Sequence, residues 1–374
     1  MEARPQRSKA ALSSAICATT IALLAYVGCF MKVQSGPLST KLDSAGFPKW
    51  LITDTQNIPK ILDRKRSPDG LLMGSSLVLS PAYKLNARHS DFSLGFLEKE
   101  LRDRLGTAVG VSNAGVAFAM ASDQSRLLDA LLSRNIKPKF VVYGLAPRDF
   151  VDNSASVDNS PTRVTLDALD PHSGQFFPRS LRLPAFENAV NAHRLVLRAI
   201  SHAGRKTLVR TLRPIFKDTS VADAAPVHSK AERVAFDLNV YPKRYNPPNQ
   251  DRLQAQLRSF EHMLQACQAN QITVLLVNMP LTQKNVDMID PELLASYEHG
   301  VTSMAERYGA EYVDLESDPT YDKPEYFDDT VHLSASGGRK FFDDLSEIIF
   351  QDNAIVRKLS SNSAHQMQNG RSVI

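Results

Sequence analysis

Short apolar runs alternate along the chain with longer stretches in which apolar residues recur at helical spacing. Each short run ends in a turn, which is the pattern of a strand buried on both faces. Strands are predicted at 69–74, 108–112, 139–145, 272–277 and 311–315. Because strands and helices alternate, the pattern predicts βαβ units, a parallel five-stranded sheet and a three-layer α/β/α sandwich of flavodoxin-like character.

Amphipathic stretches predict the helices between these strands. They extend over 92–105, 120–132, 251–269, 292–308 and 335–350. The segment 151–248 interrupts the alternation and contains one predicted helix, around 188–213, that carries several arginines. A connection of this length after the third strand predicts an inserted subdomain or a functional lid.

The N-terminus carries an uncharged run at 10–31 that follows Arg4, Arg7 and Lys9 and ends at Lys32. Its length is close to the ~20 residues that a helix needs to cross a bilayer. The positive flank favours a cytoplasmic N-terminus, with the body periplasmic or extracellular. A cleaved signal peptide is the alternative. Since no small-x-small cleavage site follows the run, we expect an uncleaved single-pass anchor.

These patterns divide the chain into four predicted parts. The parts are a cytoplasmic tip and transmembrane anchor at 1–32, a stalk at 33–66, an α/β domain at 67–352 that includes the insertion, and a polar tail at 353–374. The tail is rich in Ser and Asn, and we expect it to be disordered.

Composition narrows the range of functions. Hydrophobic residues make up 43% and charged residues 22% of the chain, an ordinary globular balance. The net charge of +4, without a basic stripe interleaved with aromatics, argues against a nucleic-acid partner. Cys267 is the one cysteine beyond the N-terminal run, and no Cys/His spacing resembles a metal site. We therefore expect no metal and no cofactor.

Candidate chemistry gathers where the strands end. In an open parallel sheet, ligands bind beyond the carboxyl ends of the strands. Residues 74–77 end the first strand, 113–115 end the second, Arg148 follows the third and 328–333 come after the fifth. A serine, backbone donors in a glycine-containing turn, a carboxylate and a histidine are thus expected on one edge. Such a set can perform acyl transfer.

Three of these segments resemble blocks of the SGNH (GDSL-type) hydrolase superfamily, and the overall arrangement looks most like its exported, membrane-anchored bacterial members. The sequence Gly-Ser-Ser-Leu at 74–77 is similar to the Gly-Asp-Ser-Leu block and places Ser76 at the nucleophile position. Asp329 and His332 match the block in which the two residues lie three apart. The resemblance implies a catalytic triad of Ser76, His332 and Asp329.

The resemblance also implies an oxyanion hole. The sequence Asn-Ala-Gly at 113–115 looks like the second block, whose glycine amide, here that of Gly115, donates to the oxyanion. Asn113 precedes it and is either a turn residue or a further member of the hole. The third block is usually Gly-x-Asn-Asp, but here Arg148 takes the Asn position. Arg148 has donors and charge, so it is the expected replacement.

Each motif has a simpler explanation when taken alone. A Gly-Ser-Ser turn is a common βα connection, and Asp329 is also placed to cap a helix. Their shared order at strand ends favours the triad. We expect an extracytoplasmic serine esterase or O-acyltransferase that acts on acyl esters of carbohydrate, with a membrane acyltransferase as a candidate partner. The alternative is a non-catalytic SGNH-like module that binds a glycan or serves as a scaffold.

Overall fold

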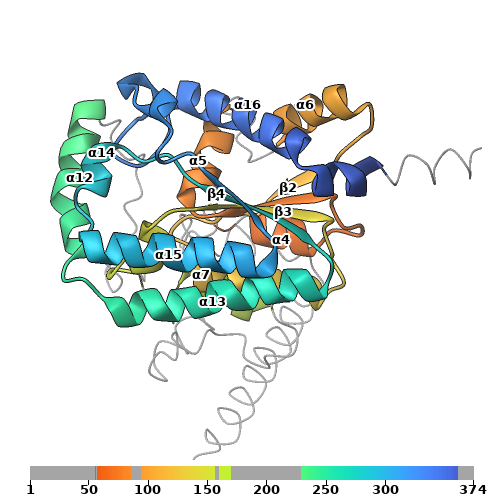
Figure 1. Ribbon diagram of the computed structural model, residues 1–374, viewed down its shortest axis with the longest axis horizontal. Helices are drawn as coiled ribbons and strands as arrows, with labels where there is room; N and C mark the ends of the chain where they lie inside the picture. Colours follow the sequence, from red (N-terminus) through yellow and green to blue (C-terminus); the bar gives the residue numbers. More distant parts are fainter. Residues whose placement is uncertain (1–54, 56, 86–93, 156–159, 170–228, 361–374) are drawn as a thin grey trace, which may run out of the picture. The chain divides into compact units, whose positions relative to one another are not determined.

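A computed structural model describes residues 55, 57–85, 94–155, 160–169 and 229–360 (Figure 1). The anchor expected at 10–31 and the helix expected around 188–213 lie outside these residues. Within the described part of the chain, no helix is both long and apolar enough to cross a membrane. The candidate site lies in the compact unit formed by Thr53–Leu166 and His228–Ile374.

Five parallel strands form one sheet in the order β2-β1-β3-β4-β5. The strands are β1 (Gly70–Gly74), β2 (Val111–Asn113), β3 (Phe140–Leu145), β4 (Thr273–Asn278) and β5 (Glu311–Asp314). This is the flavodoxin-like order, in which the chain reverses its direction of winding between β1 and β3. The predicted α/β class with an all-parallel sheet is confirmed.

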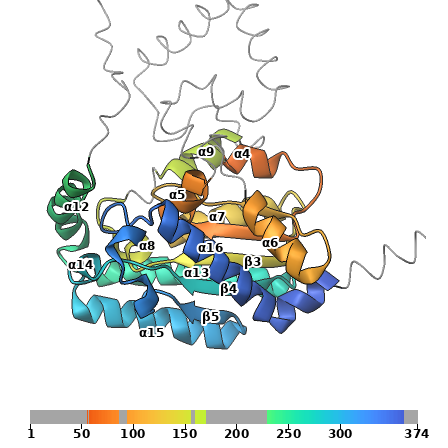
Figure 2. The ribbon, with the colours of Figure 1, turned by 90° about the horizontal axis from the view of Figure 1, so that it is seen from above.

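Helices cover both faces of the sheet (Figures 1 and 2). One face carries α5 (Ser76–Leu85), α6 (Gly95–Leu105) and α16 (Ala335–Gln351), and the other carries α7 (Ala121–Leu132), α13 (Gln250–Ala269) and α15 (Pro291–Tyr308). Every residue of β1 and β3 is buried, as expected for strands between two helical layers. In α13 the buried side chains include Leu257, Phe260, Leu264 and Cys267, which form the apolar stripe that faces the sheet.

Two segments differ from the predicted organisation. Residues 57–62, expected in the stalk, form α4 (Asn57–Leu62), which packs against α7 and buries Ile58 and Ile61. Residues 353–360, expected in a disordered tail, are helical instead, because Ile355 and Leu359 are buried against the body. Both segments therefore extend the globular part beyond the predicted limits.

A third difference lies within the predicted insertion. Its last part forms α12 (Lys230–Tyr245), a regular helix that packs near α8 (Arg148–Val151). A capping box begins α12: the amide of Glu232 donates to the Ser229 hydroxyl at 3.3 Å, and the amide of Ser229 donates to the Glu232 carboxylate at 2.7 Å. The pattern Ser-x-x-Glu was thus the sequence signal for this helix.

Glycines allow α5 to lie close to the sheet beside the turn at 74–77. Gly74 of β1 pairs with Gly144 of β3. A Cβ atom on Gly144 would lie 2.3 Å from the Cγ1 atom of Val78 and 2.9 Å from the Sδ atom of Met279. The absence of a side chain at Gly144 is therefore what lets the helix that begins at Ser76 rest on the central strands.

Gly144→Ala is expected to destabilise the full-length protein by about 1–3 kcal/mol, because an added methyl group overpacks a filled core. Urea denaturation measures the loss. Val78→Ala removes the nearest colliding methyl group, so the double variant should lose less stability than the sum of the two single variants. Additive losses would contradict the steric explanation.

Candidate active site

The nucleophile turn joins β1 directly to α5, with Ser76 as the first residue of the helix. Gly74 has a φ angle of 145°, which side-chain-bearing residues rarely adopt, so the turn depends on glycine. Two donors hold the Gly74 carbonyl: the amide of Val116 at 3.0 Å and Nε2 of Gln124 at 2.7 Å. The turn is thereby tied to the loop after β2 and to α7.

Ser76, His332 and Asp329 form a continuous chain of hydrogen bonds. The Ser76 Oγ atom lies 2.9 Å from Nε2 of His332, and Nδ1 of His332 lies 2.8 Å from Oδ2 of Asp329. The Oδ1 atom of Asp329 accepts the amides of Val331 at 2.9 Å and of His332 at 2.6 Å. The structure therefore brings the three predicted triad residues together in the order that nucleophilic catalysis by serine requires.

Asp329 remains ionised over the whole physiological range. Burial alone would raise its pKa, but the hydrogen bonds from the His332 ring and from the amides of His332 and Val331 lower it from 3.8 to about 2. A carboxylate in this state fixes the imidazole with its proton on Nδ1, which leaves Nε2 free to accept the proton of Ser76.

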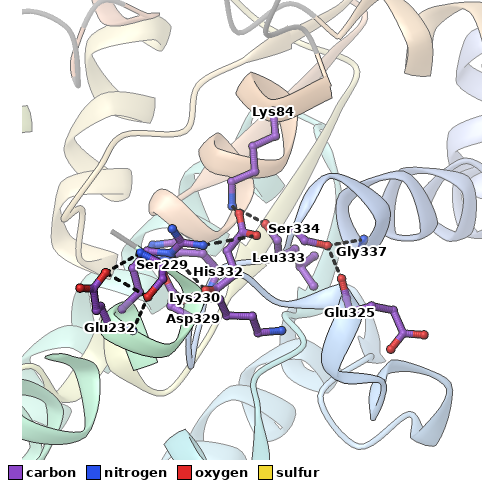
Figure 3. A network of polar contacts seen from close by, with 12 residues as sticks. Lys84, Ser229, Lys230, Glu232, Glu325, Asp329, His332, Leu333, Ser334 and Gly337 are labelled. Atoms are coloured by element: carbon purple, nitrogen blue, oxygen red, sulfur yellow. Dashed lines mark hydrogen bonds and ion pairs between the residues drawn. The ribbon is translucent and has the colours of Figure 1, made fainter. Parts of the chain in front are cut away.

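The acid–base loop, residues 328–333, is clamped to the nucleophile helix (Figure 3). Lys84, near the end of α5, pairs with the Asp328 carboxylate at 2.6 Å and donates to the Leu333 carbonyl at 2.6 Å. The loop is closed by a hydrogen bond of 2.9 Å from the Asp328 amide to the His332 carbonyl. The helix that presents Ser76 thus also holds both ends of the loop that presents Asp329 and His332.

The residues predicted for the oxyanion hole are placed as follows. The loop with Asn113 and Gly115 lies beside β1, because the Ala114 amide donates to the Leu72 carbonyl at 2.7 Å. The Gly115 amide itself donates to Oδ1 of Asn113 at 2.9 Å. The buried Nδ2 atom of Asn113 has no hydrogen-bond partner among the described residues. The oxyanion role of these two residues stays a prediction.

Arg148 is buried at the start of α8, and its guanidinium contacts α12. Its Nη1 atom donates to the Tyr241 hydroxyl at 2.9 Å, its Nε atom lies 3.7 Å from Oδ1 of Asp149, and its Cζ atom lies 5.6 Å from the centre of the Tyr241 ring. Burial opposes its charge, but Tyr241 and Asp149 raise the pKa of Arg148 overall. Its predicted role as an oxyanion donor is not tested by these contacts.

Asp149 lies between Arg148 and the nucleophile turn. Burial raises the pKa of Asp149 above its usual range, while Arg148 and the Ser75 hydroxyl lower it in part. This contact with Ser75 connects Asp149 to the residue that directly precedes Ser76. Among the described residues, no group of His, Cys, Asp and Glu side chains is arranged to hold a metal ion.

Residues 247–341 match the family model of the DltD protein. This range contains β4, β5 and the acid–base loop. The predicted SGNH resemblance is confirmed. The match covers the C-terminal part of the α/β body, and the turn at 74–77 precedes it.

Two solved structures that are similar to this chain have low sequence identity to it. A protein from Bacteroides fragilis NCTC 9343 described as an acylhydrolase is 12% identical, with a TM-score of 0.41, and the match covers 82% of this chain and 100% of that chain. The psychrotrophic esterase EstA from Pseudoalteromonas is 11% identical, with a TM-score of 0.38, over 75% of this chain and 95% of that chain. No curated protein matches the sequence.

The lowered pKa of Asp329 predicts a pH dependence of stability. Since folding lowers this pKa from 3.8 to about 2, the contribution of Asp329 is present above pH ~4 and is lost as the pH falls through the folded value. The difference in unfolding free energy between wild type and Asp329→Asn should therefore narrow by up to about 2 kcal/mol between pH ~5 and pH ~2. Urea titrations of both proteins at several pH values measure this difference. A difference that stays constant with pH would refute the prediction.

Proposed function

We propose that this SGNH-type protein forms an acyl-enzyme at Ser76 and is an ester hydrolase or an O-acyltransferase. The observation that carries the proposal is the hydrogen-bond chain from Ser76 through His332 to Asp329. A structural histidine needs neither a serine at the start of a helix nor a half-buried, ionised carboxylate behind it. The three together supply the nucleophile, the general base and the group that orients the base.

The first half-reaction transfers the acyl group to the protein. Nε2 of His332 takes the hydroxyl proton of Ser76 as Oγ attacks the ester carbonyl, and Asp329 stabilises the imidazolium. Backbone amides at the nucleophile turn, with Gly115, Asn113 and Arg148 as the predicted further donors, face the developing oxyanion. When the tetrahedral intermediate collapses, the carbon–oxygen bond to the alcohol breaks and His332 returns its proton to that alcohol.

The second half-reaction releases the acyl group. A hydroxyl group from water or from a sugar gives its proton to His332 and attacks the acyl carbonyl, and Ser76 regains a proton when its ester bond breaks. Water as acceptor gives hydrolysis, and a sugar hydroxyl gives acyl transfer. We propose carbohydrate acyl esters of the cell envelope as substrates, because the apolar run at 10–31 would tether the body outside the cytoplasm. A membrane acyltransferase is the proposed partner.

One observation favours a second candidate, a non-catalytic module that binds a glycan. The Gly115 amide is already bound to Asn113, and a donor of Arg148 is bound to Tyr241. An oxyanion hole whose donors stay occupied would lose roughly 2.7–4 kcal/mol of transition-state stabilisation for each missing donor. The two functions differ in whether Ser76 becomes acylated.

Covalent labelling by a fluorophosphonate separates these functions. The full-length wild-type protein should be labelled at Ser76, as located by mass spectrometry of the modified peptide, and should hydrolyse p-nitrophenyl acetate. Ser76→Ala and His332→Ala should each abolish the labelling and the hydrolysis, because the first variant lacks the nucleophile and the second lacks the base.

Ser259→Ala is the matched control, because Ser259 lies on α13 and donates to the Ala255 carbonyl within that helix. Ser259→Ala should be labelled at Ser76 as wild type is, should gain no label at other residues, and should retain full turnover. A folded wild-type protein that is neither labelled nor active, yet binds a glycan equally well after Ser76→Ala, would establish the non-catalytic module instead.

A further inference from the structure

Thr330, which stands between the two catalytic residues of the acid–base loop, is held by a carboxylate from α12. Its amide donates to Oδ2 of Asp237 at 2.9 Å, and its hydroxyl donates to the same oxygen at 2.8 Å. Thr330 is 1% exposed. Thr330 therefore cannot shift without breaking two hydrogen bonds to the Asp237 carboxyl group.

The opposite side of Thr330 is bound as firmly. The Thr282 hydroxyl donates to the Thr330 carbonyl at 2.8 Å, and the Thr282 amide donates to it at 3.3 Å. The Thr330 hydroxyl accepts from Nδ2 of Asn285 at 3.3 Å, on α14 (Gln283–Val286). The Asn285 side chain is oriented in turn by the Tyr245 hydroxyl, which donates to Oδ1 at 2.9 Å. The backbone of Thr330 is thus fixed through both its amide and its carbonyl.

Burying the Asp237 carboxylate carries a desolvation cost. Burial raises the pKa of Asp237 above its usual range, and the neighbouring Asp329 also raises it. The two hydrogen bonds from Thr330 and the nearby His332 lower this pKa in part. Tyr241 lies one turn along the same buried face of α12. Burying a carboxylate costs free energy that its hydrogen bonds must offset, so its presence in a buried position is weak evidence that it stabilises the fold. The presence of Asp237 at this buried position is better explained by the geometry that it imposes on the acid–base loop.

We infer that Asp237 is a positioning residue that sets the distance between His332 and Ser76 by fixing Thr330. This inference rests on the proposed function, because the triad is what it positions. Asp329 and His332 flank Thr330 on the same turn, so a displacement of Thr330 moves both. Catalytic geometry is sensitive to such movement, since a misplacement of about 1 Å can cost about 100-fold in rate.

Asp237→Ala is the variant that removes the acceptor. In full-length protein it should lower kcat for p-nitrophenyl acetate by about 10- to 100-fold and leave KM within about two-fold, because the substrate still binds while the triad is misaligned. Asp237→Asn keeps an oxygen at the acceptor position and should restore part of kcat. Thr330→Val keeps the backbone donor and should lose less than Asp237→Ala.

Asp123 on α7 offers a chemically matched control. It is also buried, and it accepts an amide, that of Met120 at 2.9 Å, and a hydroxyl, that of Ser160. Asp123→Ala should lower the melting temperature without a selective loss of kcat. A kcat for Asp237→Ala no lower than that of Asp123→Ala would overturn the inference, because the effect would then be general destabilisation.

A second measurement does not depend on turnover. The Nδ1 proton of His332, held against Asp329, should give a downfield proton resonance that disappears in His332→Ala. Asp237→Ala should shift or broaden this resonance, and Asp123→Ala should leave it in place. An unchanged resonance in Asp237→Ala refutes the positioning role whatever the activity. If the fluorophosphonate does not label the wild-type protein, yet the resonance differs between wild type and Asp237→Ala, then the proposed catalysis is refuted and the positioning role stands.

Discussion

The whole arrangement depends on one contact between distant parts of the chain: the hydrogen bond from Ser76 to His332, whose residues lie 256 positions apart. The parallel sheet makes that contact available, because it brings the carboxyl ends of β1 and β5 to the same edge. The sheet alone is not sufficient, since β3 and β4 separate these two strands. Lys84 closes the remaining gap by joining the far end of α5 to Asp328 and Leu333.

Close packing beneath the nucleophile sets the position of that contact. A side chain on Gly144 would collide with Val78, the third residue of α5, and Gly74 has a backbone conformation that other residues avoid. Ser76 can therefore stand at the edge of the sheet only because two glycines on neighbouring strands leave room for its helix. The Ser76–His332 distance is set by backbone approach at one end and by the held loop at the other.

The sequence was informative where the signal is local. The strands could be predicted because parallel strands between two helical layers are continuously apolar, and Asp329 and His332 could be paired because they lie on one turn. The Ser-x-x-Glu start of α12 was also present, but the helix carries Phe236 and Leu238 on its exposed side, with exposed fractions of 64% and 45%, and buries Asp237. The positions of the apolar residues therefore did not indicate which face of α12 is buried. A pattern that follows apolar residues cannot identify a helix whose buried side is polar.

The inner face of α12 also explains why Arg148 is accommodated where the SGNH third block usually has Asn. Asp237, Tyr241 and Tyr245 are spaced four residues apart and form one buried stripe. Asp237 binds the acid–base loop at Thr330, Tyr241 binds Arg148 after β3, and Tyr245 binds Asn285 after β4. A shorter Asn side chain would not reach the Tyr241 hydroxyl, whereas arginine does. Arg148 of the changed third block and Tyr241 of the helix in the predicted insertion are thus hydrogen-bond partners. The segments that follow β3, β4 and β5 are all bound by α12.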